Sequence, residues 1–114
     1  MRHIDRVIHA PARLKILTVL SGVEWADFPS LCRMLKLTRG NLSAHTSQLE
    51  RLGYVRVKKS IIGRMPHTEY RMTPKGRKAL AAYWATMDEI RRLEQTGLDD
   101  SQAGGKLKSC LRAE

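Results

Sequence analysis

Between Thr38 and Gln48 lies a short series of polar side chains that are well suited to specific hydrogen bonding. Arg39 can make a bidentate hydrogen bond with guanine, and Asn41 or Gln48 can pair with adenine. The hydroxyls of Thr38 and Ser43 suit phosphate oxygens, assisted by the amides at a helix N-terminus. These side chains predict contacts with DNA rather than a chemical reaction. The alternative is a face that is merely solvated.

The spacing of apolar residues places this series on one face of a helix. Leu42, Leu49 and Leu52 line the opposite face, and Gly53 stands where a helix commonly ends. Thr38 suits the N-cap. The outer face carries only small or polar residues: Gly40, Ser43, Ala44, Ser47 and Arg51. A helix with so little bulk outside fits the DNA major groove, and we expect Ala44 and Ser47 to lie against it with the polar series.

Another short helix is predicted just before it. Asp27 suits an N-cap, and apolar side chains follow on one helical face: Phe28, Leu31, Cys32 and Leu35. Lys36 and Leu37 leave only a minimal connector. The two helices together predict a helix-turn-helix.

A two-stranded ribbon is predicted directly afterwards. Residues 54–59 alternate apolar and basic side chains, which is typical of a half-buried strand. Residues 60–66 contain a glycine and a proline and should turn, and residues 68–72 should return as the second strand. A helix-turn-helix followed by a hairpin predicts a winged helix, which is a mostly α fold with a small antiparallel hairpin.

Basic side chains concentrate in this ribbon and just beyond it. The formal net charge is +10 and the pI is about 10.2. Within residues 54–78 the one acid is Glu69, and the basic residues are Arg56, Lys58, Lys59, Arg64, Arg71, Lys75, Arg77 and Lys78. Four side chains of the ribbon are expected along a DNA backbone: Lys58, Lys59, Arg64 and His67. Arg64 should reach into a minor groove, although a solvated basic face is the alternative.

Three apolar residues in the expected turn are out of place in an exposed loop: Ile61, Ile62 and Met65. We expect them to pack the hairpin back onto the body of the protein or onto a neighbouring chain. Insertion between base steps is the alternative.

Further helices are predicted on both sides of this region. Pro11 suits the first position of a helix that should run to about Leu20, with Arg13 and Lys15 facing outward. Residues 23–26 can add a small third strand beside the hairpin.

A longer helix should run from Lys75 to about Gln95, capped by Thr73 and Pro74. It carries an apolar stripe at Ala79, Leu80, Tyr83, Trp84, Met87 and Ile90. Such a stripe is unusual on a monomer, so it predicts a two-fold homodimer in which the stripe packs against its copy and residues 4–20 of the partner. The expected interface residues are Ile4, Val7, Ile8, Leu80, Tyr83, Trp84, Met87 and Ile90. The alternative is that the stripe folds back on its own core.

The domain organisation follows from these elements. Residues 1–95 are expected to form one winged-helix domain with dimerisation helices at both ends. Residues 96–114 lack sustained periodicity and are expected to form a flexible tail.

Several classes of function are disfavoured by the sequence. The four histidines, His3, His9, His45 and His67, are scattered without the spacing of metal ligands, so no metal or cofactor is expected. Cys32 lies on an apolar stripe and is expected to be a buried, inert thiol, and Cys110 is a free thiol in the tail. No catalytic constellation is recognisable, and no apolar run is long enough for a membrane span. We therefore expect a cytoplasmic protein that is not an enzyme.

The run LTRGNLSAHTSQLERLGYVRVKKSIIGRMPHTEYRMTPKGRKAL resembles winged-helix transcriptional regulators of the broad MarR/ArsR type. The resemblance covers roughly residues 4–93 and rests on the order and spacing of its pieces: Leu37-Thr38, Asn41-Leu42-Ser43 with His45, Leu49-Glu50 with Gly53-Tyr54-Val55, and Thr73-Pro74 with Gly76-Arg77. Similar regulators carry a histidine at the place of His45, which implies a hydrogen bond to a phosphate; a satisfied, partly buried histidine is the alternative. Thr46 departs from the pattern, because such regulators usually have an apolar core residue there.

The resemblance implies a sequence-specific regulator that binds double-stranded DNA as a homodimer, with repression as the commoner mode. Regulation by a small-molecule effector is an open alternative, although no cluster of polar residues in the sequence supports it. Two other classes of function compete with this interpretation. A winged helix can serve as a protein-interaction adaptor whose basic hairpin meets an acidic partner, and a basic protein can bind nucleic acid without sequence preference.

Overall fold

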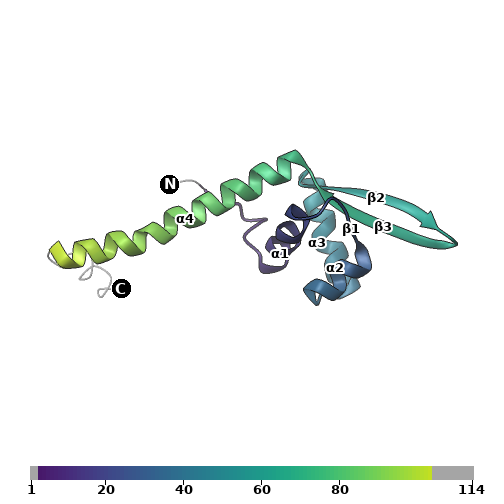
Figure 1. Ribbon diagram of the computed structural model, residues 1–114, viewed down its shortest axis with the longest axis horizontal. Helices are drawn as coiled ribbons and strands as arrows, with labels where there is room; N and C mark the ends of the chain where they lie inside the picture. Colours follow the sequence, from purple (N-terminus) through teal and green to yellow (C-terminus); the bar gives the residue numbers. More distant parts are fainter. Residues whose placement is uncertain (1–2, 104–114) are drawn as a thin grey trace. The chain divides into compact units, whose positions relative to one another are not determined.

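A computed structural model describes residues 3–103, with side chains for residues 3–96. The elements follow in the order α1 (Pro11–Ser21), β1 (Ala26–Asp27), α2 (Phe28–Leu35), α3 (Arg39–Arg51), β2 (Val55–Ile62), β3 (Met65–Met72) and α4 (Pro74–Ala103). The strands form an antiparallel sheet in the order β1-β3-β2 (Figure 1). This architecture confirms the predicted winged helix. Residues 4–83 form one compact unit, and α4 from Trp84 onward belongs to another.

The core of the 4–83 unit is built from the inner faces of α1, α2 and α3 and from the root of the hairpin. The side chains with no exposed area are Ile8, Ile16, Leu17, Leu20, Leu31, Leu42 and Leu49. Val55, Tyr70 and Met72 extend this core onto the sheet. Each buried Leu or Ile side chain contributes about 1.5–3 kcal/mol, so these contacts hold α3 against its neighbours.

The predicted starts of the first three helices are confirmed. Pro11 occupies the first turn of α1, and the side chains of Asp27 and Thr38 cap α2 and α3. The Asp27 carboxylate accepts a hydrogen bond from the Ser30 amide at 2.8 Å. That amide, and the Ser30 hydroxyl with it, holds the pKa of Asp27 below its ordinary value of 3.8.

The hairpin is longer than the sequence pattern predicted. Both strands continue to a tight turn at Gly63 and Arg64, with Ile62 paired to Met65. Residues 60–62 and 65–66 are therefore strand rather than turn. Gly63 adopts a left-handed φ of +66°, which lets the strands reverse at once. The third strand is also displaced, because β1 lies at Ala26–Asp27 rather than at 23–26.

The last helix also exceeds its predicted length. α4 runs to Ala103, so residues 96–103 are helical rather than part of a flexible tail. The single glycine at position 97 does not end the helix, since one interior glycine costs only about 1 kcal/mol relative to alanine. The remainder of the predicted tail, residues 104–114 with Cys110, lies outside the described residues.

Some side chains expected at a dimer interface are buried within the chain itself. Ile8 has no exposed area, and Leu80 and Tyr83 are 6% and 5% exposed. The Tyr83 hydroxyl lies 2.9 Å from Nδ1 of His9. The start of the α4 stripe thus contributes to the core of the 4–83 unit.

Candidate nucleic-acid interface

α3 presents a continuous exposed face of small and polar side chains. Arg39, Gly40, Asn41, Ser43, Ala44, Ser47 and Arg51 are all exposed. The Thr38 hydroxyl oxygen accepts a hydrogen bond from the Asn41 amide at 3.1 Å and so caps the helix. The hydroxyl hydrogen can still donate a hydrogen bond to another group. Arg39 lies over the ring of Phe28 at 5.4 Å from the ring centre. This contact places its guanidinium beside the first turn of the helix.

The opposite face of α3 is anchored by Leu42, Thr46 and Leu49, which are all buried. Thr46 is polar in an otherwise apolar position, but its hydroxyl donates to the Leu42 carbonyl at 2.9 Å and lies 3.4 Å from the Tyr70 hydroxyl. The buried hydroxyl is therefore satisfied, and the helix keeps its outer face turned away from the core.

Arg13 of α1 contacts the flank of α3, which corrects the prediction that it faces outward. One terminal guanidinium nitrogen of Arg13, Nη1, donates to Oε1 of Gln48 at 3.0 Å and lies 3.3 Å from Nδ1 of His45. Its Nε donates to the Val7 carbonyl at 2.6 Å. Arginine is drawn inward here because its aliphatic stem can be covered while its head meets three acceptors. His45 and Gln48 are accordingly half-buried, whereas the rest of the predicted α3 set is exposed.

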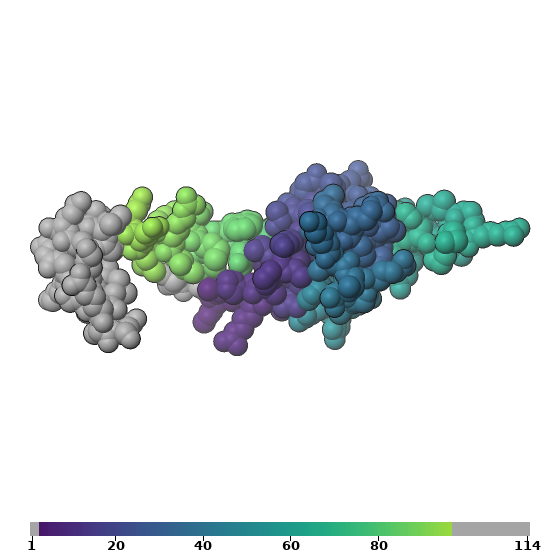
Figure 2. Space-filling model, turned by 90° about the horizontal axis from the view of Figure 1, so that it is seen from below, coloured from purple at the N-terminus to yellow at the C-terminus, as the bar shows by residue number. Residues whose placement is uncertain are grey.

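The hairpin projects beyond the body formed by α1, α2 and α3 (Figure 1). In the space-filling view it is a narrow arm next to the α2–α3 region (Figure 2). The pairing register places Lys58 opposite Glu69 and Lys59 opposite Thr68, so the two lysines lie on opposite faces of the ribbon. Both lysines and Arg64 are exposed, in agreement with a basic surface.

His67 has a partner of its own in the hairpin. Its Nε2 lies 3.3 Å from a carboxylate oxygen of Glu69, and both side chains are half-buried. The His67 ring therefore already lies beside an acid, before any contact with DNA.

The exposed apolar side chains of the hairpin do not pack onto the body. Ile61, Ile62 and Met65 are 75%, 61% and 70% exposed. The expectation that they fold the hairpin back onto its own protomer is wrong, because the strands extend them away from it. A neighbouring chain and base steps remain the two alternatives.

Trp25 is a contributor that sequence reasoning missed. The ammonium of Lys58 and the guanidinium of Arg71 lie 5.8 and 5.2 Å from the centre of its ring. Such contacts hold the two cations on one face of the ribbon root. No periodicity could have revealed Trp25, since it precedes a strand of only two residues.

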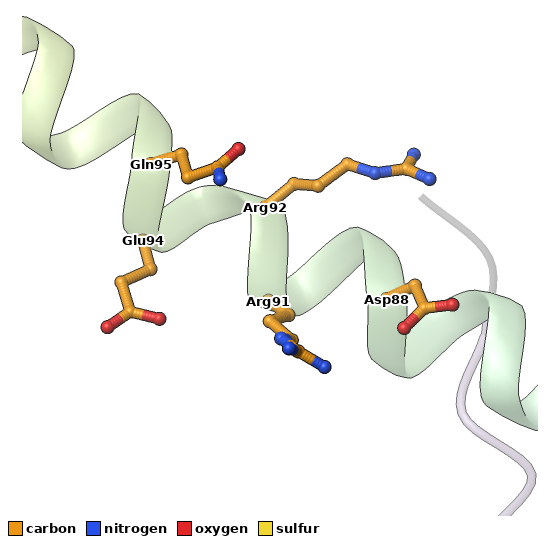
Figure 3. Close-up of a pocket in the computed structure, with 5 residues that line it drawn as sticks. All are labelled: Asp88, Arg91, Arg92, Glu94 and Gln95. Atoms are coloured by element: carbon orange, nitrogen blue, oxygen red, sulfur yellow. The ribbon is translucent and has the colours of Figure 1, made fainter.

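A hollow along α4 offers no comparable site. It is lined by Asp88, Arg91, Arg92, Glu94 and Gln95, and their side chains point in different directions from one helix (Figure 3). Among the described residues, no three His, Cys, Asp or Glu side chains gather as metal ligands. Within the same part of the chain, no helix is long and apolar enough to cross a membrane. Cys32 is only partly buried.

Residues 12–91 match the model of the winged helix DNA-binding domain family. The chain belongs to this family. The match covers α1 after Pro11, all of α2, α3 and the sheet, and much of α4. As a member of the family, the chain has the fold of DNA-binding transcriptional regulators.

One protein of similar sequence and two solved structures are similar to this winged-helix chain. An uncharacterized protein of Methanocaldococcus jannaschii is 40% identical over 78 residues, which cover 68% of this chain and 85% of that protein. A transcriptional regulator homologue from Pyrococcus horikoshii has a TM-score of 0.72 and 30% identity, covering 77% of this chain and 87% of that one. A MarR-family transcriptional regulator from Silicibacter pomeroyi shares the fold, with a TM-score of 0.59, 18% identity, and coverage of 95% of this chain and 72% of that one.

Proposed function

We propose that this winged-helix protein is a sequence-specific regulator of transcription that binds double-stranded DNA as a homodimer. The observation that carries the proposal is the exposed face of α3, which runs from Arg39 to Arg51 without a bulky apolar side chain. A helix of this kind fits the major groove, which is about 12 Å wide and presents a distinct pattern for each base pair. Asn41, Ser43 and Ser47 would lie nearest the base edges.

The hairpin supports the same proposal through its charge. Lys58, Lys59 and Arg64 are exposed on an arm that extends beside the α2–α3 region. Cations at these positions suit the phosphate backbone next to the groove occupied by α3. Arg64 lies at the tight turn, and we expect it to enter a minor groove.

The homodimer is supported by exposed apolar side chains on α4. Trp84, Ile90 and Leu93 are 44%, 36% and 53% exposed, and burying them against a second copy would remove this surface from water. A two-fold dimer would present two α3 helices to half-sites about 34 Å apart, or a multiple of that distance. Repression requires nothing more than occupancy, because a bound dimer excludes polymerase from the same stretch of DNA, and we extend the proposal to that mode.

Selection of binding sites from random duplexes tests the proposal directly. A dyad-symmetric consensus, bound with an affinity that falls steeply with salt, is the expected result. A selection without a consensus would discard sequence-specific binding and leave non-specific association.

A matched pair of variants locates the interface. Ala44 and Ala81 are both exposed alanines within helices, so Ala44→Glu and Ala81→Glu introduce the same charge in the same secondary structure. Ala44→Glu should weaken specific binding by at least about tenfold, because the new carboxylate faces the groove. Ala81→Glu should leave the affinity unchanged. Equal effects of the two substitutions would remove α3 from the interface.

A further inference from the structure

The hydrogen bonds from Arg13 to α3 run in one direction, with Arg13 as the donor. The Nη1 group lies 3.3 Å from Nδ1 of His45 and 3.0 Å from Oε1 of Gln48, and a guanidinium can only donate hydrogen bonds. Nδ1 of His45 must therefore accept, which leaves the ring proton on Nε2. The carbonyl oxygen of Gln48 is likewise engaged, which leaves its amide group as the unbound end.

These two side chains flank the small face of α3. His45 and Gln48 are three residues apart and lie on neighbouring helical turns, and Gln48 follows Ala44 by four. Both are half-buried rather than enclosed. Because Arg13 occupies the acceptor atoms of His45 and Gln48, these side chains can offer only N–H donors to DNA.

We propose that Arg13 is a positioning residue that sets the base preference of α3. It orients His45 and Gln48 as donors, so that Gln48 selects the acceptor edge of guanine, O6 and N7, in place of the adenine that an unconstrained glutamine pairs with. The Nε2–H group of His45 donates to a phosphate oxygen or a base acceptor at the edge of the same groove. This inference rests on the proposed function, since it assumes that α3 occupies a major groove.

The ring proton of His45 can be located without DNA. Nitrogen NMR of the free protein, at a pH where imidazole is neutral, distinguishes a proton on Nε2 from one on Nδ1. We expect the Nε2–H form in the native protein and a mixture of the two forms in Arg13→Met. A proton on Nδ1 in the native protein would overturn the orientation. This measurement decides the orientation even if the protein binds no DNA, so its failure is distinct from failure of the proposed function.

Site selection then tests the base preference. Arg13→Met should change the preferred base at one position of each half-site from guanine to adenine, by about tenfold in relative affinity, and leave the other positions unaltered. Lys15→Met is the matched control, because Lys15 is an exposed cation on the same helix and its loss removes the same charge. An unchanged profile for Arg13→Met contradicts the proposal, as does the same change in Lys15→Met.

A second variant guards against loss of folding in Arg13→Met, which also removes the bond to the Val7 carbonyl. Gln48→Glu keeps an acceptor for Arg13 but eliminates the amide donor. At the same position it should replace guanine by cytosine, whose N4 amino group donates to a carboxylate. Persistence of guanine with Gln48→Glu would show that the Gln48 amide does not bind the base.

Discussion

Tyr54 donates a 2.6 Å hydrogen bond to Oδ2 of Asp5, so the segment before α1 is joined to the connector that follows α3. The other oxygen of Asp5 accepts from the amides of Val7 and Ile8 at 2.9 and 3.2 Å. Burial, together with the Asp5 carboxylate, raises the pKa of Tyr54 from 10.0 to about 12. The carboxylate thus organises its own turn and also stabilises the protonated phenol.

Replacing Tyr54 by phenylalanine should lower the free energy of unfolding by about 1.5–3 kcal/mol, the usual contribution of a hydrogen bond to a charged group. Urea denaturation at neutral pH measures this difference. The raised pKa means that the folded state holds the phenolic proton more firmly than the unfolded state. Its stabilising effect is complete below pH 10.0 and is lost as the pH rises towards about 12. Tyr54→Phe should lack this alkaline loss, and an identical pH profile in both proteins would refute the linkage.

The N-cap of α2 predicts an effect at acidic pH. The folded pKa of Asp27 lies below 3.8, so its contribution is present above that pH and disappears as the pH falls through the lowered value. Asp27→Ala should destabilise the protein by about 1 kcal/mol at neutral pH, whereas Asp27→Asn should stay close to the native value because asparagine also caps well. Denaturation from neutral to acidic pH should narrow the difference in stability between the native protein and Asp27→Ala, because only the native carboxylate is protonated there. The difference between Asp27→Asn and Asp27→Ala should not change, since neither side chain titrates. A difference between the native protein and Asp27→Ala that persists in acid would argue against the carboxylate as its source.

Gly76 is required by a close backbone approach. A β-carbon built on it would overlap the Tyr54 carbonyl, a backbone group that cannot move aside easily. Gly76→Ala should therefore destabilise the protein by about 1–3 kcal/mol through overpacking. Gly40→Ala is the control, since a β-carbon there meets nothing within 4 Å and alanine reduces the entropy of the unfolded chain. Thermal melts should show a lower midpoint for Gly76→Ala alone.

The salt dependence of DNA binding should report the hairpin cations. Replacing Lys58, Lys59 and Arg64 by alanine together should reduce the slope of log K against log salt by about three, near one for each phosphate that is no longer neutralised. Removing the exposed cations Arg6, Lys15 and Arg92 instead changes the net charge equally. A comparable decrease of slope in this second variant would point to a diffuse charge effect rather than to phosphate binding by the hairpin.

The proposed dimer predicts a concentration-dependent mass. Ile90→Glu combined with Leu93→Glu places two charges on the exposed apolar part of α4, and they would be desolvated in an interface at a cost of several kcal/mol. Sedimentation equilibrium should show a dimer for the native protein and a monomer for the variant, with similar helical content in circular dichroism. A native monomer at all concentrations would reject this part of the proposal.

The fold was predictable where local signals agreed with one another. Asp27, Thr38 and Gly53 mark helix ends by local chemistry, and the spacing of Leu42 and Leu49 identifies the buried side of α3. The exposed face of α3 follows from the same periodicity. These features depend on residues within a few positions of each other, which a sequence pattern contains.

The features that escaped prediction depend on contacts between distant positions. The turn signals of Gly63 and Pro66 favoured a long loop, yet strand pairing continues up to Gly63 and places Pro66 within β3. Arg13 looked like a solvated cation because its acceptors, His45 and Gln48, are 32 and 35 residues away. Trp25 contacts cations on β2 and β3, which are distant from it in the sequence. No local spacing encodes these partners.

The strand order β1-β3-β2 leaves one side of β2 without a neighbouring strand among the described residues. An open strand invites the addition of another chain, and lysines along it discourage that event. Lys58 and Lys59 lie on β2 just before the exposed Ile61 and Ile62. The cations assigned to phosphate recognition would therefore also reduce aggregation through the open strand. Alanine variants at these positions should lower both solubility and nucleic-acid affinity, and light scattering would measure the loss of solubility separately.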